Sequence, residues 1–332
     1  MNVRVKEIAY YHPKKVYSND FFINQYDEIG VDIRGLLEVT GRNQRYASEN
    51  ESETSLTMAI EAAKKVMDKA KVDAEELNLI VYVSCTPEFL SPTNALKIHH
   101  ALKGGKHTMV YDINCNCVGM VVAMEQVCRM MKSNANVKHA LVVGSEQLKR
   151  YARVSEPITF ANFGESACAI LLENVMDGES DFIDSSYYTD SSLNEYIMFP
   201  PKGFSQVLPT DKSLPKDEKV IQWLDFDTDD AFASSVDSIN EILTRNNLTK
   251  KDIKKYCLSQ FAKKNIDLIR KTMDEPEEKY PFVGDEFGYT GATSPFLAFA
   301  KCIENNEIKR GDNVIFWSVG AGVTCSCILM KY

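Results

Sequence analysis

Apolar and polar residues alternate along the chain in blocks that predict strands and helices following one another. Strands are predicted by the apolar runs at residues 3–11, 79–84, 109–113, 140–143 and 167–172. Helices are predicted where apolar side chains recur at helical spacing, at residues 54–69, 92–102 and 118–131. Residues 79–84 are apolar almost throughout, as expected for a strand buried on both faces. The pattern predicts an α/β fold around a largely buried sheet.

The second part of the chain repeats this plan. The polar turn at residues 72–77 and the strand after it have a counterpart in residues 248–253 and a strand at 256–258. A helical stretch precedes each turn, at residues 56–69 and 229–246, and residues 164–171 resemble residues 322–329. We therefore expect two related halves, residues 1–175 and 176–332. Chance likeness between α/β segments remains the alternative. The polar, proline-containing stretch 200–219 is expected to be a surface excursion.

Composition excludes several classes of protein. The net charge of -9 argues against a generally basic nucleic-acid surface. No apolar run approaches the roughly 20 residues of a membrane helix, and Glu7 follows too soon for a signal peptide. Nine cysteines in 332 residues are too sparse for a disulfide scaffold, so we expect reduced thiols and a cytoplasmic setting. The Cys-x-Cys pairs at 115–117 and 325–327 have no nearby histidine, and we expect no metal site.

Residues 111–120 (Tyr-Asp-Ile-Asn-Cys-Asn-Cys-Val-Gly-Met) carry the candidate chemistry. A strand is expected to end here and a helix to begin near Cys117. The positive end of a helix dipole favours a thiolate, and the apolar helix that follows should turn Cys117 toward the interior. By itself, a cysteine at such a position is also a common small core residue.

This segment resembles the thiolase superfamily, specifically the β-ketoacyl-acyl-carrier-protein synthase III group, in which an aspartate and small residues precede the nucleophilic cysteine. Further likenesses follow in the family's order along the chain. They are Thr-Gly-Arg-Asn-Gln-Arg at 40–45, Glu-Thr-Ser at 53–55, the helix around 59–65, Phe-Gly-Glu-Ser-Ala-Cys-Ala at 163–169, and Gly-Ala-Gly-Val-Thr at 320–324. The resemblance thus extends over most of the chain.

The resemblance implies a five-layered αβαβα fold of two similar halves, assembled as a homodimer. It implies that Cys117 is acylated by an acyl-CoA or an acyl-carrier protein, with no further cofactor, and that the acyl group then passes to a carbon nucleophile. The backbone N–H of Cys117 and one N–H from the loop Gly320–Gly322 are implied to form the oxyanion hole. Each such donor contributes roughly 3–4 kcal/mol to catalysis.

Two catalytic positions depart from the family pattern. Where the family has a histidine, this chain has Gln260, or Ser259 if the alignment shifts by one residue; no residue after His139 is a histidine. Where the family has an asparagine, this chain has Tyr289. Glutamine cannot exchange protons near neutral pH, so we expect acylation of Cys117 to persist while malonyl decarboxylation is weak or absent. A degenerate site in which Gln260 and Tyr289 only fill space is the alternative.

The expected entrance for CoA also differs. Gly35 and Val39 occupy the places of a tryptophan that stacks on adenine and an arginine that pairs with phosphate. We therefore expect an acyl-carrier protein to be the better donor. Four basic residues on the helix after Gln260 are candidates for docking this acidic partner, or else belong to a solvated helix face: Lys263, Lys264, Arg270 and Lys271.

The sequence thus predicts a divergent acyltransferase of the synthase III type, in fatty-acid or specialised lipid metabolism. The rival hypothesis is a non-catalytic subunit that forms a heterodimer with an active homologue. Cys117 favours the enzyme, whereas the changed residues at 260 and 289 favour the subunit.

Overall fold

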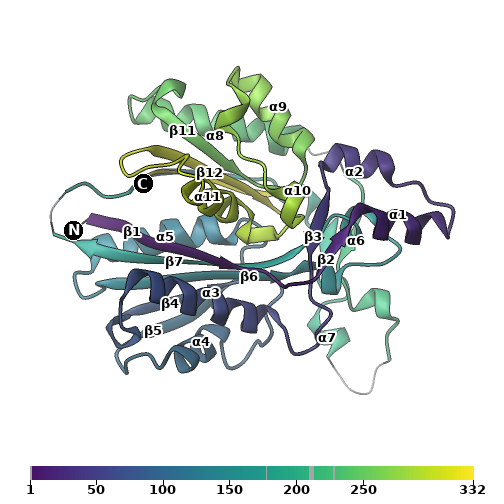
Figure 1. Ribbon diagram of the computed structural model, residues 1–332, viewed down its shortest axis with the longest axis horizontal. Helices are drawn as coiled ribbons and strands as arrows, with labels where there is room; N and C mark the ends of the chain where they lie inside the picture. The colour runs from purple at the N-terminus through teal and green to yellow at the C-terminus, as the bar shows by residue number, and fades with distance from the viewer. Residues whose placement is uncertain (1, 177, 209–212, 227–228) are drawn as a thin grey trace.

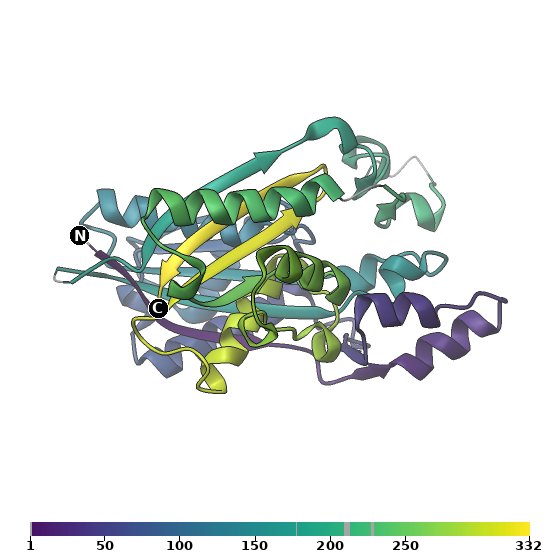
Figure 2. The same ribbon diagram turned by 90° about the horizontal axis from the view of Figure 1, so that it is seen from above.

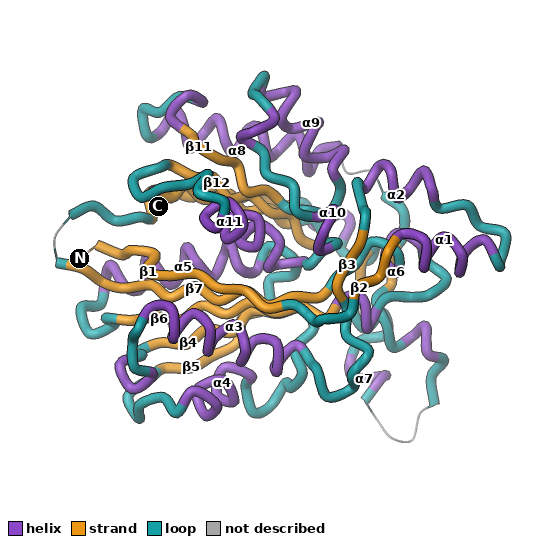
Figure 3. The backbone as a smooth tube through the Cα atoms, viewed as in Figure 1, coloured by secondary structure: helices purple, strands orange, loops and turns teal. Residues whose placement is uncertain are grey.

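The computed structural model describes residues 2–176, 178–208, 213–226 and 229–332. Its two larger sheets lie one above the other with helices between and outside them (Figures 1 and 3). The first sheet has the strand order β1-β7-β6-β4-β5, and the second has the order β11-β12-β13-β8. The small pairs β2-β3 and β9-β10 lie outside them.

The elements have the following bounds. The strands are β1 (Asn2–Tyr11), β2 (Val16–Ser18), β3 (Gln44–Tyr46), β4 (Leu79–Val83), β5 (Met109–Ile113), β6 (His139–Gln147), β7 (Glu165–Val175), β8 (Phe182–Thr189), β9 (Ile197–Met198), β10 (Gln222–Trp223), β11 (Ile253–Leu258), β12 (Asn313–Gly320) and β13 (Thr324–Lys331). The helices are α1 (Asn19–Asp27), α2 (Arg34–Thr40), α3 (Ser55–Ala70), α4 (Asn94–Leu102), α5 (Gly119–Ser133), α6 (Pro157–Phe160), α7 (Phe204–Val207), α8 (Asp229–Arg245), α9 (Lys263–Met273), α10 (Gly284–Phe287) and α11 (Ser294–Glu304).

Three apolar cores hold five layers together. The central core lies between the sheets and contains α5 and α11 side chains such as Val121 and Phe296. A second core packs α3 and α4 on the outer face of the first sheet, and a third packs α8 and α9 on the outer face of the second. The order of layers is helix, sheet, helix, sheet, helix. The five-layered αβαβα fold expected from the sequence is therefore observed.

The apolar pattern located the elements well and the strand ends less well. All five residues of β4 are buried, as its uninterrupted apolar run predicts. β6 and β7 run beyond the predicted apolar cores because buried polar residues continue the ladder, with Glu146 paired to Ser166 and Gln147 paired to Glu165. Hydrophobic periodicity cannot reveal a strand end made of buried polar residues.

The two turns that suggested an internal repeat have the same local structure. Each is a single 3-10 turn closed by a capping box, with Asp73 and Glu76 in one and Thr249 and Asp252 in the other. Each leads to a strand of its own sheet, β4 and β11 respectively. The boundary between halves at residues 175 and 176 remains a prediction.

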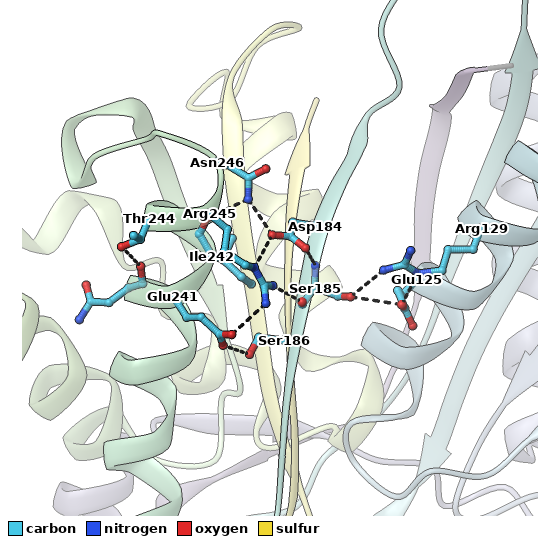
Figure 4. Close-up of polar contacts among 11 residues, drawn as sticks. Glu125, Arg129, Asp184, Ser185, Ser186, Glu241, Ile242, Thr244, Arg245 and Asn246 are labelled. Carbon is cyan, nitrogen blue, oxygen red and sulfur yellow. Dashed lines mark hydrogen bonds and ion pairs between the residues drawn. The ribbon is translucent and has the colours of Figure 1, made fainter.

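β8, an edge strand of the second sheet, is held from both sides by polar side chains (Figure 4). On the side of α5, Arg129 donates to the Ser185 hydroxyl at 3.2 Å. On the side of α8, Arg245 and Asn246 both donate to Asp184, at 3.0 and 2.7 Å. These contacts fix β8 to the helices on both faces of its sheet.

Residues 16–46 form a projection at one end of the molecule, where α1 and α2 lie in both views (Figures 1 and 2). Its own small core includes Phe22, Tyr26 and Leu37. Within the described ranges, none of the helices has both the length and the apolar character needed to cross a membrane.

Candidate active site

Cys117 lies just before the first residue of α5, in the connection that follows β5. β5 runs parallel to β4, with Ile113 beside Val83 at the ends of the two strands. The first turn of α5 is packed directly against β4, because a Cβ atom at Gly119 would lie 2.7 Å from Val83 Cγ1. This close packing fixes where the connection, and hence the thiol of Cys117, can lie.

Cys117 lines a cavity of about 450 Å³. The cavity is mainly apolar, and its wall includes residues of α2, α6, α8, α9, β9, β10 and the β12–β13 turn. They include Leu36, Val39, Ile158, Ile197, Trp223, Phe226, Phe232, Phe261, Val319 and Val323. Val39 and Lys264 are exposed, whereas Tyr289 is buried, so the cavity leads from the surface to the thiol. Such a shape suits a chain-like apolar ligand with its reactive end inside.

The structure brings Tyr289 to Cys117. Two backbone hydrogen bonds of 2.9 Å fix the backbone of Tyr289: its N–H donates to the Asn162 carbonyl, and its carbonyl accepts from the Gly164 N–H. Its phenol lies beside the Cys117 thiol, and both residues line the same cavity. Burial, and then the neighbouring sulfur of Cys117, raise the pKa of Tyr289 well above its ordinary value. The phenol therefore stays protonated and can act only as a donor toward sulfur or a substrate oxygen.

The structure does not bring the side chain of Gln260 to Cys117. The Gln260 amide donates to the carbonyl of Leu258 at 2.8 Å and to that of Pro281 at 3.2 Å. Its oxygen accepts from the Val283 N–H at 2.9 Å. All of these partners are backbone groups, so the Gln260 carboxamide serves to anchor the chain. The sequence-based expectation that the Gln260 side chain stands beside Cys117 is therefore not met by these contacts.

Ser259 is the residue that faces the site, which favours the one-residue shift. Its buried hydroxyl lies close enough to Tyr289 to lower the pKa of the phenol. Burial raises the same pKa by more, so the net change is upward. The neighbouring chain is held by Arg42, which donates to the carbonyls of Gln260 and Phe261, each at 2.6 Å. The arginine of the Thr-Gly-Arg motif thus positions the segment that carries Ser259.

The glycine loop also lies at the site. Ser318 donates to the Cys117 carbonyl at 2.9 Å, and Asn116 donates to the Ala321 carbonyl at 3.1 Å. A Cβ atom on Gly320 would meet Asn116 Cβ at 3.0 Å, so the turn approaches the cysteine loop closely. Gly322 has a φ of +123°, a backbone conformation that glycine adopts easily and residues with a side chain rarely adopt. The oxyanion hole between the Cys117 N–H and this loop remains a prediction.

Cys85 is a residue of the site that the sequence analysis missed. It follows β4. Its thiol lies beside the Cys117 thiol and donates a hydrogen bond to Glu146 Oε2 at 3.3 Å. The contact with Cys117, followed by burial, raises the pKa of Cys85 well above its ordinary value. Burial raises the pKa of Glu146 to about 7. The only signal in the sequence is that Cys85 follows one parallel strand and Cys117 the next, since such ends meet at one sheet edge.

The four basic residues of α9 differ in how free they are. Lys263 pairs with Asp267 at 3.1 Å and with Glu277 at 3.3 Å. Arg270 pairs more weakly with Asp267, at 3.7 Å. Lys264 is exposed and lines the cavity, and Lys271 is exposed further along the helix. Among the residues described, no group of three or more His, Cys, Asp or Glu side chains is arranged to hold a metal ion.

Two family models match the chain. Residues 111–191 match 3-oxoacyl-[acyl-carrier-protein] synthase III, and residues 243–332 match the C-terminal part of the same family. Together the matches cover more than half of the chain. The chain belongs to the 3-oxoacyl-[acyl-carrier-protein] synthase III family.

Individual synthase III proteins agree with this assignment over their full length. A β-ketoacyl-[acyl-carrier-protein] synthase III of Wolbachia pipientis subsp. Culex pipiens is 29% identical, with 97% of this chain and 96% of the relative covered. One from Clostridium perfringens is 27% identical, with 99% of each covered. The crystal structure of the synthase III from Aquifex aeolicus shares the fold, with a TM-score of 0.86, 24% identity and complete coverage of both chains.

Proposed function

We propose that this protein is an acyltransferase that carries an acyl group as a thioester on Cys117. The observation that carries the proposal is the position of Cys117 in a largely apolar cavity that leads to the surface. All nine cysteines are free thiols, which supports a reduced, cytoplasmic setting.

In this proposal the Cys117 sulfur attacks the carbonyl carbon of an acyl thioester, and the donor's thiol departs. The oxygen of the tetrahedral intermediate would be bound by the Cys117 N–H and an N–H of the turn Gly320–Gly322. Fixed donors of this kind stabilise the intermediate without reorganising. The protonated phenol of Tyr289 supplies a hydrogen bond to the sulfur.

The second half-reaction distinguishes this protein within its family. An enolate formed by malonyl decarboxylation would meet only the neutral donors of Ser259 and Tyr289. Neutral donors stabilise developing charge less than charged ones do. We therefore propose transfer of the acyl group with slow or absent decarboxylation of malonyl thioesters.

We propose an acyl-carrier protein as donor and a homodimer as the assembly. Lys264 at the cavity, with Leu268 and Lys271, forms an exposed face of α9 that suits an acidic partner. Val39, 45% exposed at the cavity mouth, offers CoA neither a stacking ring nor a cation. β5 is an edge strand with Met109 54% exposed, so that edge is open to a second copy.

The test is mass spectrometry of the protein after incubation with matched acyl-CoA and acyl-carrier-protein donors. We expect one acyl group per chain on Cys117, and none in Cys117→Ala. Absence of an adduct with every donor would instead favour the non-catalytic subunit, which copurification with an active homologue would identify.

A further inference from the structure

The Cys117 thiol must lose a proton when it attacks a thioester, and the structure points to where that proton goes. Two polar side chains lie beside the thiol, the Tyr289 phenol and the Cys85 thiol. The phenol is a donor, since burial and the neighbouring sulfur keep it protonated. Cys85 is the partner that can accept.

From Cys85 the contacts continue to Glu146, at the end of β6. The Cys85 thiol donates to Glu146 Oε2 at 3.3 Å, which leaves the Cys85 sulfur free to accept from Cys117. The Glu146 side chain is completely buried. Tyr289, Cys117, Cys85 and Glu146 therefore follow one another, with Cys85 between the nucleophile and the carboxylate.

The surroundings of Glu146 suit a group that gains and loses a proton. Its other hydrogen-bond partners are neutral: the hydroxyls of Ser84 at 3.1 Å and Thr86 at 2.8 Å, and the N–H groups of Cys85 and Thr86. The remaining packed elements present the phenol of Tyr82 on β4, Ser166 on β7 and Gly291 of the turn before α11. Burial thus sets the pKa of Glu146 near neutrality, at about 7.

We propose that Glu146 accepts the proton of Cys117 through the thiol of Cys85 when Cys117 is acylated. As the Cys117 sulfur bonds to the acyl carbon, its proton moves to Cys85 and the Cys85 proton moves to Glu146. When the bond between the acyl carbon and the donor sulfur breaks, Glu146 gives its proton back through Cys85 to the departing thiolate, which leaves as a thiol, and the carboxylate is regenerated. Cys85 and Glu146 are positioning residues, because they act through Cys117. The inference rests on the proposed acyl transfer and identifies its proton acceptor.

The competing explanation is that Glu146 only holds the turn of Ser84 and Thr86. Cys85→Ala separates the two, because it removes the relay sulfur and keeps the backbone bonds of the turn. Cys85→Ser keeps a group that can pass a proton. Glu165→Gln is the matched control: Glu165 is buried in the same sheet, burial raises its pKa to about 7, and it bonds to the N–H groups of Ser48 and Arg150.

The measurement is the rate of Cys117 acylation from about pH 5.5 to about pH 9. For the wild type we expect a rise that levels off above about pH 7, as Glu146 ionises. Cys85→Ala and Glu146→Gln should each be roughly 100-fold slower at neutral pH, with a rate that keeps rising with hydroxide. Their double variant should be no slower than either single one, since both interrupt one relay. Cys85→Ser should regain the plateau, and Glu165→Gln should match the wild type.

Alkylation of Cys117 by iodoacetamide, located by peptide mass, gives a second readout that needs no acyl donor. If alkylation shows the same pH profile and the same losses in the variants, the relay is supported. This holds even if no donor acylates the wild type, because that result would refute only the proposed acyl transfer. If Cys85→Ala keeps the wild-type rate and pH profile in both assays, the relay is refuted. Equal losses in Glu165→Gln and Glu146→Gln would also refute it. If Glu146→Gln fails to fold, the two Cys85 variants decide.

Discussion

The hydroxyl of Ser318 donates a 2.9 Å hydrogen bond to the carbonyl oxygen of Cys117. It joins β12 of the second sheet to the connection between β5 and α5, so residues 201 positions apart are fixed relative to each other. The bond sets the orientation of the Cys117 peptide next to the glycine turn that is expected to share the oxyanion hole.

Replacing Ser318 by alanine should therefore impair both stability and acylation. An unsatisfied carbonyl at this position should lower the free energy of unfolding by about 1–3 kcal/mol. Ser326 is the control, because it pairs with Ser318 across the ladder and its buried hydroxyl has no hydrogen-bond partner. Urea unfolding and acylation rates should show a clear loss for Ser318→Ala and little change for Ser326→Ala; equal effects would contradict the role given to this bond.

Restoring the family's catalytic pair should restore decarboxylation. We expect Ser259→His with Tyr289→Asn to release carbon dioxide from malonyl-carrier protein at least about 100 times faster than the wild type, because a proton-exchanging group then faces the thioester. Gln260→His with Tyr289→Asn should not, and it should lose stability with the backbone bonds of Gln260. If only the variant Gln260→His with Tyr289→Asn gains decarboxylation, residue 260 and not residue 259 corresponds to the family's histidine. Fast release by the wild type would refute the proposed block.

The donor preference should depend on the exposed face of α9. The double variant Lys264→Glu, Lys271→Glu should slow acylation by acyl-carrier protein and leave acylation by the matching acyl-CoA unchanged, since only the protein donor presents an acidic surface. Lys254→Glu reverses an exposed charge on β11 and serves as the control. Faster acylation by acyl-CoA than by acyl-carrier protein in the wild type, with no effect of charge reversal, would contradict the proposed donor preference. It would count against both the missing CoA contacts at Val39 and the docking face on α9.

The buried carboxyl of Glu146 should also make stability depend on pH. Because burial raises its pKa to about 7 in the folded state, the folded protein binds more protons than the unfolded chain in the window between the ordinary value of 4.5 and 7. The contribution of Glu146 to stability therefore falls as pH rises through this window. Between about pH 5 and about pH 8, the free energy of unfolding measured in urea should fall less for Glu146→Gln than for the wild type. The exposed Glu28→Gln variant should retain the full fall; if Glu146→Gln does too, the carboxyl is not protonated as inferred.

Much of the fold follows from hydrophobic periodicity, because strands such as β4 are apolar on both faces. The ends of β6 and β7 do not, since Glu146 and Glu165 are polar residues buried in the ladder. Cys117 was found because its local sequence resembles a known motif.

The rest of the site depends on contacts that no local pattern encodes. Cys85 reaches Cys117 only through the parallel pairing of β4 with β5. The choice between Ser259 and Gln260 depends on which side chain the backbone of Pro281 and Val283 captures. Sequence spacing favoured Gln260, whereas the tertiary hydrogen bonds favour Ser259.

The central claim is that Cys117 carries the acyl group, and peptide mass mapping after acylation tests it most directly. The account predicts that the adduct lies on Cys117 alone and disappears in Cys117→Ala, while Cys115→Ala, which alters the neighbouring thiol, still acquires it. An adduct on Cys115 or Cys85 as the primary site, or no adduct with any acyl-CoA or acyl-carrier protein, would contradict the account.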